Sequence, residues 1–101
     1  MQVGVMKTDQ DVTIRLEGRF DFSTHRDFRA AVEKASQEAT GNLILIDLGG
    51  VDYLDSSALG MLLMLRDKVG VAKKSVSLTN CRGNVRQVLD IANFGKLFTI
   101  D

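Results

Sequence analysis

The spacing of apolar residues in the first half of the chain predicts a hairpin followed by a helix. Val12, Ile14 and Leu16 alternate with polar residues, as in a half-buried strand that Gly18 would end. Residues 2–8 indicate a weak edge strand, joined antiparallel to the first through a turn at residues 9–11. A helix that Ser23 or Thr24 could cap should follow. Its apolar residues fall at i, i+3, i+4 and i+7: Phe28, Ala31, Val32 and Ala35.

The second half of the chain alternates strands and helices. Residues 43–48 are apolar on both faces, as expected of a central parallel strand, and Gly49–Gly50 should break it. A deeply packed helix should run from Ser57 to Val69 and stop at Gly70. A short strand at 75–79, a third helix over 85–92 stopped by Gly95, and a last strand at 97–100 should follow.

This order of elements predicts one α/β domain over residues 1–101. Strand–helix–strand units favour parallel pairing with right-handed crossovers, so we expect a mixed, mostly parallel sheet of four to five strands with three main helices. The element order is β-β-α-β-α-β-α-β. At 101 residues and 45% hydrophobic content, the domain can form a core without disulfides or metals.

Composition favours a cytoplasmic protein with no membrane partner. The longest near-continuous apolar segment, Ala58–Leu65, is too short to span a bilayer, and the N-terminus lacks a signal-peptide pattern. The single cysteine, Cys81, cannot form an internal disulfide, which fits a reducing compartment. We interpret Cys81 as a small core residue rather than a reactive thiol.

Charge is unevenly distributed although the formal net charge is zero. Residues 66–86 carry six bases and one acid, Asp67. The bases are Arg66, Lys68, Lys73, Lys74, Arg82 and Arg86. No aromatic residue or reader motif accompanies them, so we expect no direct nucleic-acid binding but a solvated surface that could face a partner protein.

The most informative stretch joins the central strand to the second helix at Asp55-Ser56-Ser57. Free N–H groups and the positive end of the helix dipole at such a junction favour an anion. A serine there can be a helix cap, a nucleophile or a phosphorylation site. From the residues alone, capping and phosphorylation remain open as alternatives.

Catalysis and metal binding have little support. The only histidine, His25, falls in the loop before the first helix, and no G-x-S-x-G elbow surrounds Ser56, so an enzyme is not expected. Asp47, Asp52 and Asp55 read as solvated turn residues rather than as a metal site, with Asp47 satisfying backbone groups. No phosphate-binding glycine motif is present, and no cofactor is expected.

Three segments carry a resemblance to a known family: LILIDLGGVDYLDSSALGML, LEGRFDFSTHRDF and VRQVLDIANFGKLFTI. The first resembles the signature of the STAS-domain anti-sigma factor antagonists, a strand ending in Asp-Leu and then Asp-Ser-Ser-Gly-Leu-Gly opening a helix. The resemblance implies phosphorylation at Ser56, preceded by the acid Asp55, and a role in kinase binding for Asp21. Ala58 stands where the family usually has glycine, which should stiffen the first helical turn.

The resemblance also implies a mechanism in bacterial partner switching. The unphosphorylated domain would bind and sequester an anti-sigma factor that is also its serine kinase. Phosphorylation of Ser56 would release that partner, and a metal-dependent serine phosphatase would restore binding. The output would be sigma-dependent transcription in motility, biofilm formation or stress. The alternatives are a STAS module that senses a small ligand or nucleotide, and a small hydrolase that uses Ser56 with His25.

The expected partner surface combines polar and apolar residues around the second helix. Asp21, Asp55, Ser57 and Ala58 would contact the partner, and the phosphorylation site would lie at the rim of the interface. Some of Met61, Leu62, Met64 and Leu65 should remain near the surface, because the helix has more apolar residues than one buried stripe needs. Met61, nearest the N-terminus, would form the apolar centre of the interface.

Overall fold

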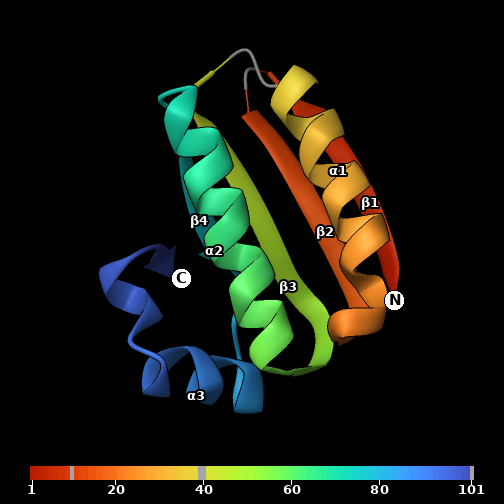
Figure 1. Ribbon diagram of the computed structural model, residues 1–101, viewed down its shortest axis with the longest axis vertical. Coiled ribbons are helices and arrows are strands. Elements are labelled where there is room, and N and C mark those ends of the chain that lie inside the picture. The colour runs from red at the N-terminus through yellow and green to blue at the C-terminus, as the bar shows by residue number, and fades with distance from the viewer. Residues whose placement is uncertain (10, 39–40, 101) are drawn as a thin grey trace.

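The five strands form one sheet in chain order (Figure 1). The computed structural model describes residues 1–9, 11–38 and 41–100. The strands are β1 (Gln2–Thr8), β2 (Asp11–Phe20), β3 (Leu43–Leu54), β4 (Ser75–Thr79) and β5 (Thr99–Ile100). β1 pairs antiparallel with β2, and the other neighbours pair in parallel. The predicted mixed, mostly parallel sheet is confirmed; residue 10 of the predicted turn lies outside the described residues.

Three α-helices follow the predicted order: α1 (His25–Glu38), α2 (Ser56–Val71) and α3 (Gly83–Ile91). Helices α1 and α2 lie side by side on one face of the sheet (Figure 1). The alternating residues of β2 that were expected to be buried, Val12, Ile14 and Leu16, are inaccessible to solvent beneath them. The predicted stripe of α1 is buried as well. The periodicity of the sequence therefore located this core correctly.

Two strands are longer than predicted, and both extensions support the candidate site. Gly18 does not end β2; it adopts a left-handed φ of 101° within a stretch of shifted register, and the strand continues to Phe20. Gly49–Gly50 does not break β3, which runs on to Leu54. The reason is pairing between the strands: Gly50 lies beside Glu17, and Leu54 beside Phe20.

The close approach of β2 and β3 at Gly50 predicts a large effect of a single methyl group. In Gly50→Ala the new Cβ would lie 2.6 Å from Glu17 Cγ and 3.1 Å from the Leu16 carbonyl oxygen. We expect a loss of about 1–3 kcal/mol in the free energy of unfolding, measured by chemical denaturation. Gly70→Ala in α2 is the matched control, because no atom lies within 4 Å of the Cβ that this substitution adds. It should gain about 0.5–1 kcal/mol, and equal destabilisation of both variants would contradict this account.

The helix ends differ from the predictions for local reasons. Helix α2 continues through Gly70, and α3 stops at Ile91, before a left-handed Asn93 with φ 59°. Gly95 therefore does not end α3 but lies in a 3₁₀ helix, η2 (Phe94–Lys96). Ser23 and Thr24, the predicted caps of α1, belong to another 3₁₀ turn, η1 (Phe22–Thr24), which directly precedes that helix. In the final segment only Thr99 and Ile100 form a strand.

Candidate partner-binding and phosphorylation site

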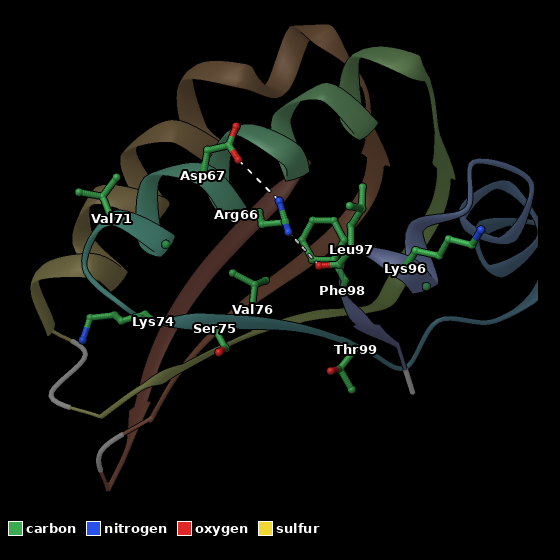
Figure 2. A pocket seen from close by; sticks show the side chains of 12 residues that line it. Arg66, Asp67, Val71, Lys74, Ser75, Val76, Lys96, Leu97, Phe98 and Thr99 are labelled. Atoms are coloured by element: carbon green, nitrogen blue, oxygen red, sulfur yellow. Dashed lines mark hydrogen bonds and ion pairs between the residues drawn. The ribbon is translucent and has the colours of Figure 1, made fainter.

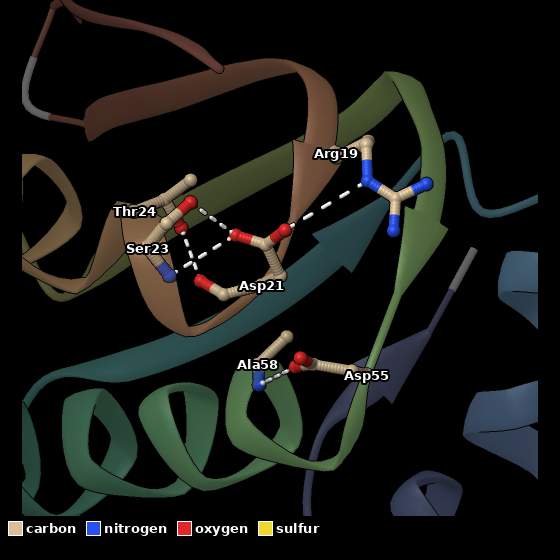
Figure 3. A network of polar contacts seen from close by, with 6 residues as sticks. All are labelled: Arg19, Asp21, Ser23, Thr24, Asp55 and Ala58. Atoms are coloured by element: carbon tan, nitrogen blue, oxygen red, sulfur yellow. Dashed lines mark hydrogen bonds and ion pairs between the residues drawn. The ribbon is translucent and has the colours of Figure 1, made fainter.

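Adjacent ends of β2 and β3 place the two predicted acids, Asp21 and Asp55, next to each other in the fold. Phe20 and Leu54 are the last register pair, and each acid follows one of them. The pairing extends one step further, because the Asp55 N–H donates to the Phe20 carbonyl at 3.3 Å. Each acid then begins a helical segment, η1 or α2 (Figure 3).

Asp55 is the N-cap of α2. Its backbone is extended, and its Oδ1 accepts a hydrogen bond from the Ala58 N–H at 2.9 Å. The Asp55 carbonyl accepts from the Leu59 N–H at 3.2 Å. Ser56 and Ser57 are consequently the first helical residues, so the alternative that these serines cap the helix is wrong. Capping by Asp55 leaves the Ser56 side chain exposed and that of Ser57 partly buried.

The first backbone amides of α2 are available to an anion. A helix leaves its first four N–H groups without intrahelical partners. Asp55 takes that of Ala58, whereas those of Ser56 and Ser57 have no acceptor within the described residues. The positive end of the helix dipole adds to their field. The Ser56 hydroxyl therefore lies where added negative charge on that residue would be stabilised by its own helix.

Asp21 is held as a carboxylate by η1, which it caps. Its Oδ1 accepts from the Ser23 N–H at 3.1 Å and from the Ser23 hydroxyl, while Arg19 Nε lies 3.7 Å from Oδ2 (Figure 3). The hydroxyl of Ser23, aided by its N–H and by Arg19, lowers the pKa of Asp21. Arg19 also lies over the Tyr53 ring, 4.1 Å from its centroid. Both acids are thus fixed parts of the fold rather than free loop residues.

Because Asp55 caps α2, replacing it tests capping and charge separately. Asp55→Ala should cost about 0.5–2 kcal/mol of stability, since the Ala58 N–H loses its acceptor. Asp55→Asn keeps a capping oxygen and should retain nearly all of that stability while losing the negative charge. Thermal melts of both variants measure the stability that each loses. A stability loss in Asp55→Asn equal to that in Asp55→Ala would contradict the capping assignment.

A mainly apolar groove of about 310 Å³ lies between the start of α1 and the first turns of α2. Its lining residues are Phe22, His25, Arg29, Ser57, Gly60, Met61 and Met64. Phe22 is 65% exposed and stacks on the His25 ring at 4.9 Å, and Met64 is 44% exposed. Sequence reasoning missed Phe22, an aromatic residue in a polar turn outside any periodic pattern. The structure places this groove beside Ser57, one residue from Ser56.

The structure buries two of the residues that were predicted to contact the partner, so the expectation that Met61 remains near the surface is wrong. Met61 is only 7% exposed and forms part of the groove floor, and Ala58 is fully buried. These residues lie on the buried stripe of α2, with Leu62, Leu65 and Val69. Ala58 therefore presents no surface to a partner, and a charge at position 61 would disrupt the core. Of the four apolar residues expected near the surface, Met64 is exposed and Leu62 and Leu65 are not.

Asp47, another of the acids considered as a candidate, has a local structural role. Asp47 lies within β3, where its Oδ1 accepts from the Gly49 N–H at 2.9 Å and from Asn80 Nδ2 at 3.0 Å. Partial burial opposes ionisation, but these hydrogen bonds together lower the pKa of Asp47. The expectation that Asp47 satisfies a backbone group is confirmed. Asp52 is exposed on β3 rather than in a loop, and Cys81 is buried, as predicted.

His25 is the first residue of α1 rather than a loop residue. Its ring stacks on Phe22, and its Nδ1 lies 3.1 Å from the Phe22 carbonyl oxygen.

Among residues 1–9, 11–38 and 41–100, no helix has the length and apolarity that crossing a membrane requires.

The family model described as "Mlab, STAS domain" matches residues 3–99. This chain belongs to the STAS domain family. A STAS-domain containing protein of Pseudomonas aeruginosa (strain UCBPP-PA14) is 50% identical over 91 residues, which cover 90% of this chain and 88% of that protein. The anti-sigma F factor antagonist of Lysinibacillus sphaericus is 31% identical over 91 residues, 89% of this chain and 77% of the relative.

Solved structures share the fold. The anti-sigma factor antagonist SpoIIAA in its unphosphorylated form aligns with a TM-score of 0.74 and 23% identity, over 99% of this chain and 87% of that one. An anti-sigma factor antagonist from Mycobacterium paratuberculosis aligns with a TM-score of 0.85 and 21% identity, over 98% and 83% of the two chains. The relative from Lysinibacillus sphaericus, together with the family model, makes the chain a STAS domain of the anti-sigma factor antagonist type.

Proposed function

We propose that this STAS domain is a phosphorylation-controlled antagonist in the bacterial cytoplasm. Unphosphorylated, it binds and sequesters an anti-sigma factor that is also a serine kinase, and so frees a sigma factor. Phosphorylation of Ser56 releases the kinase, and a metal-dependent serine phosphatase restores binding. The domain itself is substrate and ligand, not enzyme, because ATP and metal belong to its partners.

The observation that carries this proposal is the position of Ser56. Its hydroxyl is exposed because Asp55, not Ser56, caps α2. Ser57, one residue further, is partly buried against the groove, so a kinase would reach it less readily. Among related structures, SpoIIAA is also known in its phosphorylated form, and it aligns with this chain at a TM-score of 0.73 and 22% identity.

The local charges explain how a phosphate would weaken binding without unfolding the domain. A phosphoryl group adds about −1.5 to −2 charges and three acceptor oxygens. The amides of Ser56 and Ser57 would stabilise it within the domain, while Asp21 and Asp55 already contribute negative charge nearby. A partner covering this surface would have to desolvate the phosphate beside the apolar groove. Repulsion and desolvation together oppose the complex.

The groove gives the unphosphorylated complex its apolar anchor. Phe22 and Met64 leave apolar surface exposed at its two walls, and Met61 contributes the floor. Interfaces commonly enclose such a centre within a polar border. Here that border would consist of Asp21, Asp55 and Ser57.

Phosphorylation mapping tests the proposal directly. The protein is incubated with ATP and each soluble serine kinase of its organism, and the modified residue is identified by peptide mass spectrometry. We expect one phosphate, on Ser56, removed by a metal-dependent serine phosphatase. A phosphate confined to Ser57, or none with any of those kinases, would overturn the proposed switch.

A further inference from the structure

A wide groove lies away from Ser56, beside the C-terminal half of α2. It is an open groove of about 720 Å³ between α2, the start of β4 and the segment around β5 (Figure 2). Arg66 in α2 is ten positions after Ser56, which corresponds to about 15 Å along the helix axis. The groove and the phosphorylation site can therefore be occupied at the same time.

The lining of this groove is positively charged. Arg66, Lys74 and Lys96 line it from three separate segments, and the acid among its lining residues, Asp67, pairs with Arg66, Nη1 to Oδ1 at 3.8 Å (Figure 2). Arg66 Nε donates to the Leu97 carbonyl at 2.9 Å, and Lys74 Nζ to the Gly41 carbonyl at 2.8 Å. These contacts hold two of the cations in place before any ligand arrives. With three cations and one acid among its lining residues, the groove has a positive net charge that favours an acidic ligand.

A strand edge and apolar walls accompany the charges. β5 pairs with β4 only at Ser77 and Leu78, so the Ser75–Val76 half of β4 has no strand beyond it within the described residues. Val71 is 88% exposed and Leu97 41% exposed at the walls. A small anion would use the cations alone, whereas an extended peptide would also use the strand edge and the apolar walls.

We propose that this groove binds an acidic, extended segment of a partner protein along the edge of β4. Carboxylates of the segment lie against Arg66 and Lys96, and its apolar side chains contact Val71 and Leu97. This site is separate from the proposed switch and does not depend on phosphorylation. It gives the domain a second contact surface, one that a partner can hold while the Ser56 surface is free or modified.

A defined probe tests the groove in the intact protein. The ¹⁵N-labelled protein is titrated with an N-acetylated octapeptide that alternates Glu and Val, with its Lys-Val counterpart as control. We expect amide shifts at Ser75, Val76 and Thr99 with the acidic peptide only, weakened by added salt. Lys96→Glu and, separately, Arg66→Glu should weaken binding by roughly tenfold or more, as reversal of a contacting charge does.

Control variants and control ligands distinguish peptide binding in the groove from loss of the fold and from binding of a small anion. Lys7→Glu, the same charge change on an exposed position of β1, should bind the peptide normally. Lys96→Glu serves if Arg66→Glu loses its fold through the lost bond to Leu97, which the amide spectrum reveals. Normal binding by Lys96→Glu, shifts mapped to another surface, or saturation by inorganic phosphate or ATP but not by the peptide would overturn the proposal. Head-to-tail self-association through the groove, seen by light scattering, would replace the partner segment with a second copy and also overturn it.

Discussion

Ser56→Ala is expected to abolish phosphorylation by the cognate kinase while leaving kinase binding intact. The variant lacks the acceptor hydroxyl but keeps the Asp55 cap, the groove and both carboxylates. Because Ser56 is an exposed helical residue and not a cap, the free energy of unfolding should change by no more than about 0.5 kcal/mol. The domain would be locked in its binding-competent form. Phosphate incorporation, titration calorimetry with the kinase and thermal melts measure these three properties.

Ser57→Ala is the matched control for that result. It removes the neighbouring hydroxyl and should still be phosphorylated on residue 56. Ser56→Asp should weaken kinase binding only partly, because a carboxylate supplies less charge and fewer acceptor oxygens than a phosphate. If Ser56→Ala kept its phosphate while Ser57→Ala lost it, the site would have to be reassigned.

Met64→Glu should weaken binding of the unphosphorylated domain to its kinase by at least about 2 kcal/mol, roughly thirtyfold in Kd. Met64 is 44% exposed at the groove wall, so a carboxylate there meets water in the free protein and the apolar centre of the interface in the complex. The fold should be retained, in contrast to a charge at the buried Met61. Titration calorimetry with the kinase and circular dichroism test both parts.

Ile91→Glu provides the comparison for Met64→Glu. Ile91 is 83% exposed in α3 and does not line the groove, so the same change of an apolar residue to glutamate should leave binding unchanged. Equal affinity of the two variants, whether both weak or both normal, would remove the groove from the interface. The switch would then have to act through the polar residues Asp21, Asp55 and Ser56 alone.

The elements that sequence analysis located correctly are those in which one periodicity prevails. In β2, strict alternation distinguished the buried from the accessible side, and in α1 a single apolar stripe did so. Helix α2 is apolar nearly all round, so its sequence did not indicate which residues face the sheet. Which residues of α2 face the sheet depends on tertiary packing. The burial of Met61 and Ala58 was therefore not predicted from the sequence.

Other errors came from glycines whose effect depends on distant residues. Gly49 and Gly50 favour a break by local propensity, yet pairing of β3 with β2 keeps the strand intact to Leu54. The extended pairing in turn delivers Asp55 as the cap. The motif therefore indicated the right junction, but which of its residues caps the helix required the geometry of two strands far apart in sequence. Phe22 and the groove were not accessible to pattern analysis for the same reason.

The attachment of the site to β2 and β3 has a consequence for the thermodynamics of recognition. These strands have ten and twelve residues, and they lie at the centre of the sheet. Segments of this kind open to hydrogen exchange mainly through global unfolding, unlike short terminal elements. The backbone that bears Asp21 and Asp55 is thus already ordered before a partner arrives, and little conformational entropy is lost on association. In the proposed switch, the affinity for the partner then depends on the phosphorylation state of Ser56, because no folding step accompanies binding.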